Sequence, residues 1–239
     1  MLRAGGYRVS QIRRHTVCPH KTKTDTFLYN HQYGPNDAHT LAVGCADHRV
    51  HLFDLRYPNE PIAVLAGHRK ATSYVRFLSG GDSLVSASTD STLCVWDVRE
   101  EAICNGPGKS TQQQGGNSTQ PKQSEKFTPA RVLEGHVNEK NFVGLSVGGG
   151  DLIACGSETN EVFVYHKSFD RPMVRYGFDD DSSGVGANGA LRAHGDDDTT
   201  GGPDMPAHFI SATCWRGEDD ILLVANSSGS IKALQVVEA

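Results

Sequence analysis

The stretch LVSASTDSTLCVWDVR, residues 84–99, decides the fold that this sequence predicts. A short apolar run leads into the polar turn STDST, and a second run follows in which apolar residues alternate with others. Alternation with a period of two is typical of a half-buried β-strand, and two such runs joined by a polar turn predict a β-hairpin.

The same pattern occurs four times along the chain. The other copies are LAVGCADHRVHLFDLR (41–56), LIACGSETNEVFVYHK (152–167) and LLVANSSGSIKALQVV (222–237). Their turns are centred on Asp47, Asp90, Thr159 and Ser228, so that successive copies lie 43, 69 and 69 residues apart. The first spacing matches the ~40–45 residues of a WD-repeat blade.

Two insertions account for the longer spacings. Residues 104–126 and the acidic, Gly-rich residues 179–204 are strongly polar, and we expect disordered loops there because such segments bury too little apolar surface to offset the entropy of ordering. Without them the period returns. The sequence therefore predicts an all-β fold, a partial WD-repeat β-propeller of about four blades over residues 26–237. Residues 1–25 show no strand periodicity and remain unassigned.

WD-type propellers usually have more blades than four, since closed propellers hold about four to eight and this type lies towards the upper end. We therefore expect the chain to be the C-terminal part of a larger propeller, with an open edge if it is expressed alone.

A Gly-His pair precedes two of the hairpins, at residues 67–68 and 135–136. In a WD blade the His, a strand Ser, the turn Asp and the Trp can form a hydrogen-bonded chain, because buried polar groups need partners. Blade two offers the full set: His68, Ser86 or Ser88, Asp90 and Trp96.

The third copy differs at these positions. Tyr165 and His166 replace Trp96 and Asp97, and Thr159 replaces the turn Asp. We expect the third blade to keep its architecture and to lose the hydrogen-bonded chain.

Composition excludes several classes of function. A formal net charge of -5 and a pI near 6.1 give no reason to expect nucleic acid or an acidic membrane as a partner. No apolar run approaches the ~18 residues of a membrane helix. The six cysteines lack CxxC spacing, which indicates free thiols in a reducing compartment. We expect a location in the nucleus and cytoplasm.

No catalytic or metal-binding motif stands out. Two groups of potential zinc ligands, at residues 15–20 and 45–51, lack two-pair zinc spacing. GxSxG, P-loop, HExxH and paired-carboxylate motifs do not occur. The sequence predicts a non-catalytic chain with no metal and no cofactor.

Several segments resemble one known family. They are GHRKATSYVRFLS (67–79), VNEKNFVGLSV (137–147), GSETNEVFVYHK (156–167) and FISATCWRG (209–217). They are similar to the C-terminal WD propeller of the photomorphogenesis repressors, the COP-type RING ubiquitin ligases and their SPA partners. The resemblance covers about residues 38–237 apart from the insertions. VNEKNF resembles the COP branch, whereas SYVRF and CWRG resemble the SPA branch.

The resemblance implies a substrate-recognition or regulatory module that binds Val-Pro peptides of transcription factors and photoreceptors, in the ubiquitin-dependent control of light signalling. The implied contacts are Lys70 as charge partner, Glu139 as polar anchor, Phe142 as pocket wall and, more weakly, His48. Tyr74, counted from the Gly-His pair as the equivalent of Phe142, lies near the same channel mouth. The alternative is that the two aromatic rings pack the inner strands and that Lys70 and Glu139 are a solvated pair. The remaining family contacts fall in blades that this chain lacks.

The motif WDVR, with Trp96, Asp97 and Arg99, is echoed by FDLR at residues 53–56. It is similar to the WDxR box of receptors that dock on the adaptor of cullin-based ligases. The alternative is that Trp96 and Asp97 are a packing pair and that Arg99 is a solvated arginine on the edge of the blade. Two further alternatives stay open for the whole chain: a generic WD-repeat scaffold unrelated to ubiquitin, and a truncated product without function.

Overall fold

A computed structural model of the chain describes residues 28–36, 39–99, 127–140, 142–178, 208–217 and 220–236. The predicted insertions 104–126 and 179–204 and the segment 1–25 lie outside these residues. The described residues form β-strands and one short 3₁₀-helix, Gly149–Asp151. Among them there is no helix with the length and hydrophobicity to cross a bilayer.

Four antiparallel sheets follow one another along the chain, and we name them blades I to IV. Blade I holds β1 (Leu28–Tyr33), β2 (Thr40–Cys45), β3 (Arg49–Asp54) and β4 (Ala63–Ala66). Blade II holds β5 (Thr72–Phe77), β6 (Ser83–Ser88), β7 (Leu93–Asp97) and β8 (Arg131–Leu133). Blade III holds β9 (Leu145–Val147), β10 (Leu152–Gly156), β11 (Glu161–His166) and β12 (Val174–Gly177). Blade IV holds β13 (Ile210–Trp215), β14 (Ile221–Asn226) and β15 (Ile231–Gln235). The prediction of an all-β, partial WD propeller of about four blades is confirmed.

The predicted hairpins are the second and third strands of the blades. Their pairing registers are symmetric about Asp47, Asp90, Thr159 and Ser228, the predicted turn centres. The residue after each centre has a positive φ: 70° at His48, 64° at Ser91, 58° at Asn160 and 86° at Gly229. All four turns therefore place this residue in the left-handed region, although only one of them has the glycine that tolerates it best.

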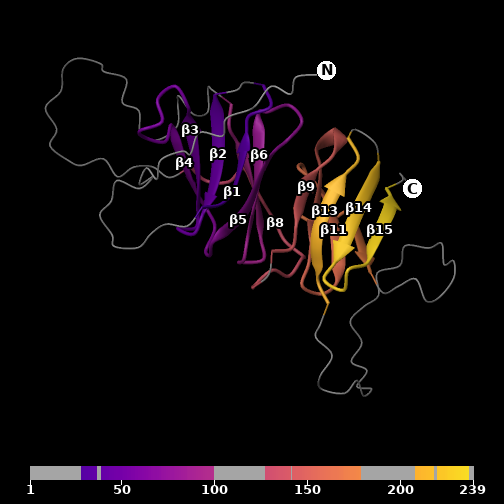
Figure 1. Ribbon diagram of the computed structural model, residues 1–239. Coiled ribbons are helices and arrows are strands. Elements are labelled where there is room, and N and C mark those ends of the chain that lie inside the picture. Colours follow the sequence, from indigo (N-terminus) through magenta and orange to yellow (C-terminus); the bar gives the residue numbers. More distant parts are fainter. Residues whose placement is uncertain are drawn as a thin grey trace, which may run out of the picture.

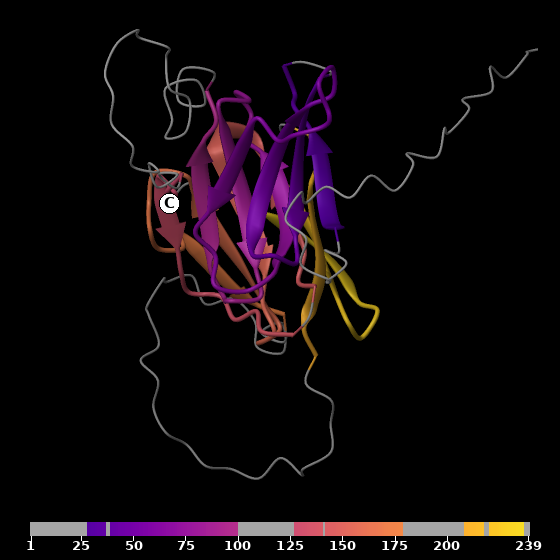
Figure 2. The ribbon, with the colours of Figure 1, turned by 90° about the vertical axis from the view of Figure 1, so that its left-hand side faces the viewer.

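The blades stand side by side, with blades I and II on one side of Figure 1 and blades III and IV on the other. Figure 2 views the molecule from the left-hand side of Figure 1, so that blades I and II lie in front of blades III and IV. The first strand of each blade contacts the first strand of the next. At the junction of β1 and β5, the Asn30 side chain accepts the Val75 N–H at 3.2 Å and that of Gln32 accepts the Phe77 N–H at 2.7 Å.

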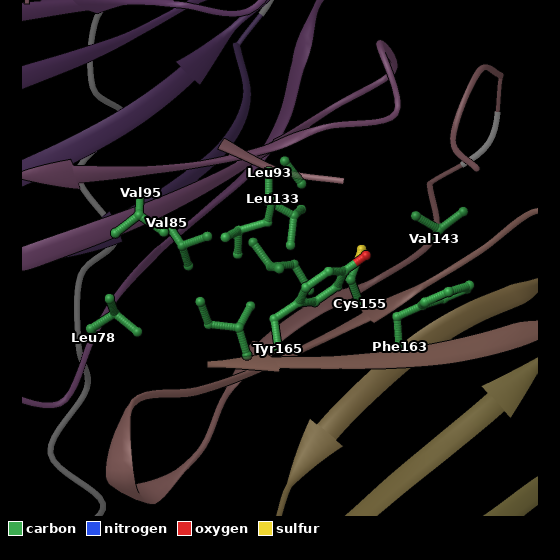
Figure 3. Close-up of a cluster of buried hydrophobic side chains, with 12 residues drawn as sticks. Leu78, Val85, Leu93, Val95, Leu133, Val143, Cys155, Phe163 and Tyr165 are labelled. Atoms are coloured by element: carbon green, nitrogen blue, oxygen red, sulfur yellow. The ribbon is translucent and has the colours of Figure 1, made fainter. Parts of the chain in front are cut away.

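Apolar side chains fill the space between consecutive blades. Three clusters of buried residues each draw members from two neighbouring blades. Figure 3 shows the cluster between blades II and III, where Val85, Leu93 and Val95 face Tyr165 and Cys155. Burial of this apolar surface stabilises the arrangement at roughly 25 cal/mol per Å². Because the clusters lie between blades, each blade needs its neighbours.

Candidate functional site

A buried chain of hydrogen bonds joins four side chains of blade II. Nε2 of His68 lies 2.8 Å from Ser86 Oγ, and the indole N–H of Trp96 donates to the same hydroxyl at 2.8 Å. Nδ1 of His68 lies 3.4 Å from the Asp90 carboxylate. The predicted set is present, and Ser86 rather than Ser88 is its serine.

Asp90 also fixes the loop that follows His68. Its carboxylate accepts the Arg69 N–H at 2.7 Å and the Thr92 hydroxyl at 2.6 Å. Burial favours the neutral acid, but the hydrogen bonds from His68, Thr92 and Arg69 outweigh it and hold the pKa of Asp90 well below its ordinary range. The charged carboxylate therefore ties the loop to the turn.

Blade III replaces this chain with a direct contact. Tyr165 pairs with Ile153 as Trp96 pairs with Leu84, so the two aromatic residues hold the same position in their hairpins. The Tyr165 hydroxyl lies 3.1 Å from His136 Nδ1 and accepts the His136 backbone N–H at 3.2 Å. The expectation that blade III loses its hydrogen bonds was therefore only partly right, because a phenol can bond to the histidine without an intervening serine.

His166 takes over a local role of Asp97. Nδ1 of His166 accepts the Ser168 N–H at 3.1 Å, as Oδ1 of Asp97 accepts the Arg99 N–H at 3.1 Å. The Tyr-His pair of blade III thus preserves both the packing and the strand-end turn of the Trp-Asp pair.

Removing the Tyr165 hydroxyl tests this substitution. Tyr165→Phe is expected to lower the free energy of unfolding by about 1–3 kcal/mol, since the buried groups of His136 lose their partner while the ring volume stays. Urea unfolding measures the change. Tyr57→Phe, at a ring that is 74% exposed, is the matched control and is expected to change it by less than about 0.5 kcal/mol. Equal effects of the two variants would contradict the role of the Tyr165–His136 contact.

The turns of the hairpins and the loops after the Gly-His pairs lie together at one end of the blades. The Thr89 N–H donates to Ala71 O at 3.2 Å and the Glu158 N–H to Val137 O at 2.8 Å. We name this surface the end face; it comprises the turns 46–48, 89–91 and 158–160, the loops 69–71 and 137–140, and Phe142. Such loops on a rigid scaffold are where binding residues concentrate.

The loop that carries Glu139 is held from two sides. One carboxylate oxygen of Glu158 accepts the N–H groups of Glu139 at 2.9 Å and Lys140 at 2.6 Å. From blade II, Ser91 Oγ bonds to the backbone N–H of Asn138 at 2.9 Å and to its carbonyl at 3.1 Å. The exposed Glu139 side chain therefore stands on a fixed backbone.

Three aromatic side chains from three blades meet on the end face, and we name them the aromatic cluster. The Phe142 ring lies 5.7 Å from that of Tyr29 and 6.1 Å from that of Tyr74, centroid to centroid. Phe142 is 50% exposed and Tyr29 43% exposed, whereas burial raises the pKa of the half-buried Tyr74 above its ordinary value. The cluster offers an apolar surface that an apolar peptide side chain can cover.

The predicted equivalence of Tyr74 and Phe142 is wrong. Tyr74 pairs with Ala87 inside β5, whereas Phe142 precedes β9. Val75 pairs with Ser86, and Leu145 pairs with Cys155. Ser86 and Cys155 lie at the same distance before the turn centres of their own blades. The residue that corresponds to Tyr74 is therefore Gly144. The two rings meet because the Phe142 side chain contacts the Tyr74 ring from the loop before β9. They do not occupy equivalent positions of the repeat.

Lys70 and His48 belong to the same end face. Lys70 is exposed on the loop after His68, and its carbonyl accepts the Ser88 hydroxyl at 3.0 Å. In the repeat, His48 corresponds to Ser91 and Lys70 to Asn138, which bond to each other across blades II and III. By this equivalence we expect His48 and Lys70 to be neighbours across blades I and II.

Sequence reasoning missed Tyr29 and Glu158. Tyr29 lies on β1, which no Gly-His pair precedes, so its place could not be counted along the chain. Glu158 takes part through its carboxylate contacts to backbone groups, which no residue pattern reveals.

The WDVR motif is partly buried. Trp96 is 1% exposed, so it does not itself contact a partner. The Arg99 side chain is 59% exposed and forms an ion pair with Asp97, donating from Nε to Oδ1 at 3.0 Å. Arg56 and Asp54 repeat this pairing in blade I. At the surface the motif presents a paired arginine and carboxylate.

Three potential metal ligands come together in blade I, within residues 45–51, where the sequence shows no two-pair zinc spacing. Ligand atoms of Cys45, Asp47 and His51 lie within 4.8 Å of one another. Nε2 of His51 lies 2.9 Å from Asp47, and this hydrogen bond by itself brings the two side chains together. The cluster therefore needs no ion to explain it.

Comparison with known proteins first defines the class. A family model described as WD domain, G-beta repeat matches residues 59–97. The fold resembles the crystal structure of the computationally designed Ika4 protein with a TM-score of 0.53 at 14% identity, over 88% of this chain and 92% of that chain. The chain therefore contains a WD repeat within a partial WD-propeller fold.

Several proteins are more similar to this chain in sequence. E3 ubiquitin-protein ligase COP1 of Pisum sativum is 42% identical over 203 residues, 85% of this chain and 24% of that protein. Protein SPA1-RELATED 3 of Arabidopsis thaliana is 40% identical over 206 residues, 86% of this chain and 20% of that protein. WD repeat-containing protein RUP2 of Arabidopsis thaliana is 35% identical over 208 residues, 86% of this chain and 44% of that protein. The resemblance to the WD-repeat part of the COP/SPA family is confirmed, and the chain spans about a quarter or less of its COP and SPA relatives.

Proposed function

We propose that this chain is a peptide-recognition module of a COP/SPA-type ubiquitin ligase system. It binds Val-Pro motifs of target proteins at the end face and performs no chemistry itself. The observation that carries the proposal is the half-exposed aromatic cluster of Tyr29, Tyr74 and Phe142 on the end face. The loops of the same face carry the exposed Lys70 and Glu139.

The chemistry of the end face suits an extended peptide with an apolar anchor. Phe142 and Tyr29 are exposed aromatic rings that contact each other, so an apolar residue of a peptide can cover both at once. Lys70 gives the end face an exposed positive charge, which favours acidic residues beside the Val-Pro pair. Partner subunits of the COP/SPA type and a cullin-ligase adaptor, reached through the exposed Arg99 and Asp97, belong to the same proposal.

A generic WD-repeat scaffold unrelated to ubiquitin is the second candidate. The similarity to RUP2, whose name specifies only WD repeats, favours it. The two candidates differ in what they require of a ligand, since only the first requires the Val-Pro pair.

Two substitutions on the end face test the proposal by titration calorimetry with a Val-Pro peptide that carries acidic neighbours. Lys70→Glu is expected to weaken binding about tenfold through lost attraction, and Phe142→Ala about 30-fold, the loss of a central aromatic anchor. Arg171→Glu, a reversal of an exposed charge on the loop between β11 and β12, is the matched control and is expected to leave the affinity unchanged.

The outcomes separate the candidates. If replacing Val-Pro by Ala-Ala in the peptide left the affinity unchanged, the result would favour the generic scaffold. Equal affinities of the Phe142→Ala and Arg171→Glu variants would overturn the assignment of the end face.

A further inference from the structure

A half-buried arginine on the first strand of blade II has no acidic partner among the described residues. Arg76 lies on β5, and the first strands of neighbouring blades contact one another, as the strands around the central channel of a propeller do. Burial lowers the pKa of Arg76 below its ordinary value. Both neighbours of β5, the strands β1 and β9, belong to the described part of the chain, and neither supplies a carboxylate to this guanidinium.

One nitrogen of Arg76 fixes the orientation of the guanidinium. Nη1 donates to Asn30 Oδ1 at 2.9 Å and to the Val75 carbonyl at 2.8 Å. Because Asn30 lies on β1, the first of these bonds also links blade II to blade I. The other donors, on Nε and Nη2, form no hydrogen bond within the residues that the structure describes. Nε and Nη2 together form an edge that can bind a carboxylate through two parallel hydrogen bonds.

Arg76 lies close to the aromatic cluster. Tyr74 and Arg76 are two positions apart on β5, so their side chains leave the strand on the same face. Burial raises the pKa of Tyr74, whereas a hydrogen bond with the Gly144 backbone and the charge of Arg76 lower it, which requires the guanidinium to lie near the phenol. Asn30, which accepts a hydrogen bond from the guanidinium, directly follows Tyr29 on β1.

The position of Arg76 along β5 determines what can reach it. The strand leads away from the loop 69–71 of the end face, so Arg76 lies further from this face than Tyr74 does. Two positions of a strand span about 7 Å, which is also the length of two residues of an extended peptide. A peptide whose apolar residue covers the aromatic cluster can therefore bring a side chain to Arg76 from one or two residues away. Lys70 lies on the loop itself and is a separate charge of the site.

We propose that the Nε–Nη2 edge of Arg76 binds a carboxylate of the recognised peptide, supplied by an aspartate or glutamate within two residues of the apolar anchor. The inference rests on the proposed function, because it needs a peptide on the end face. A carboxylate suits the site since it is planar, accepts two hydrogen bonds and neutralises a half-buried charge. Arg76 then determines specificity, because a peptide with an amide at that position leaves the guanidinium without a charged partner.

Titration calorimetry with a Val-Pro peptide that carries acidic residues at the two positions on each side of the pair tests this assignment. Each acid in turn is exchanged for its amide, and every peptide is measured with the parent chain and with two variants. Arg76→Gln is expected to weaken binding of the acidic peptide about 20-fold, the effect of a charged hydrogen-bond partner. With one of the amide peptides the same substitution is expected to change the affinity less than about twofold. Arg171→Gln, at an exposed arginine between β11 and β12, is the matched control and is expected to change no affinity.

Arg76→Lys distinguishes a bidentate contact from a simple charge. Lysine keeps the positive charge but lacks the planar pair of donors, so this variant is expected to bind the acidic peptide about fivefold more weakly than the parent chain. Urea unfolding of both Arg76 variants measures the separate effect of losing the hydrogen bond to Asn30. That loss lowers stability with any peptide, whereas only a direct contact makes the effect of Arg76→Gln depend on one particular acid.

The outcomes distinguish this inference from the proposed function. A parent chain that does not bind the peptide would overturn both. A parent chain that binds, with Arg76→Gln weakening the acidic peptide and all the amide peptides equally, would overturn the inference alone and leave Arg76 as a structural link between blades I and II. An affinity of Arg76→Lys equal to that of the parent chain would contradict the bidentate contact.

Discussion

Replacing Trp96 with alanine is expected to lower the free energy of unfolding by about 3–5 kcal/mol, the range for deleting a buried aromatic ring. Trp96 is 1% exposed and packs in the cluster between blades I and II. Its indole N–H also satisfies the hydroxyl of Ser86, which is itself buried, so the substitution removes packing and a hydrogen bond together. Urea unfolding followed by circular dichroism measures the loss.

Trp96→Phe separates the two contributions. This variant keeps most of the apolar volume and loses only the donor, so its expected cost is about 1–3 kcal/mol. If Trp96→Ala cost less than about 1 kcal/mol, the claim that this tryptophan holds blade II against blade I would be wrong.

Acidification from pH 7 to pH 4 is expected to reduce stability by about 3 kcal/mol through His136 alone. Burial lowers the pKa of His136 to about 4 from its ordinary 6.5. The unfolded chain therefore takes up a proton below pH 6.5 while the folded chain does not until about pH 4. Stability is full above pH 6.5 and falls as the pH drops towards 4, by about 1.4 kcal/mol for each unit between the two pKa values.

The His136→Asn variant is the control for this pH dependence. It lacks the titrating ring, so its stability is expected to change much less between pH 6.5 and 4.5, although its absolute stability is lower. Asp47 and Asp90 do not interfere in this window, because hydrogen bonds that outweigh burial lower their pKa values and their stabilisation is lost only at more acid pH. An equally steep loss in the variant and the parent chain would contradict the assignment to His136.

The hairpins could be predicted from the sequence because the information lies within one short segment. Each has a period of two and a polar turn, and the pairing registers follow from symmetry about the turn centre. The set around His68 was predictable for the same reason, since its members keep fixed offsets from Asp90.

Contacts between blades were harder to predict. The Tyr74–Phe142 equivalence failed because blade III has two extra residues between its Gly-His pair and its inner strand, and only the pairing of β9 with β10 reveals them. The Tyr165–His136 hydrogen bond forms because the phenol side chain is long enough to bring its hydroxyl to the histidine ring. Aligning the repeats does not predict this contact. Tyr29 joins the aromatic cluster from a strand with no sequence marker.

We propose that the end face recognises a Val-Pro peptide through the aromatic cluster. A Val-Pro peptide with a photo-crosslinking group beside the valine, irradiated with the chain and analysed by mass spectrometry, tests it most directly. We expect crosslinks to Tyr29, Tyr74 and Phe142 that excess unlabelled peptide suppresses. Crosslinks confined to the outer edge of the blades, at residues 131–135 and 171–174, would contradict it.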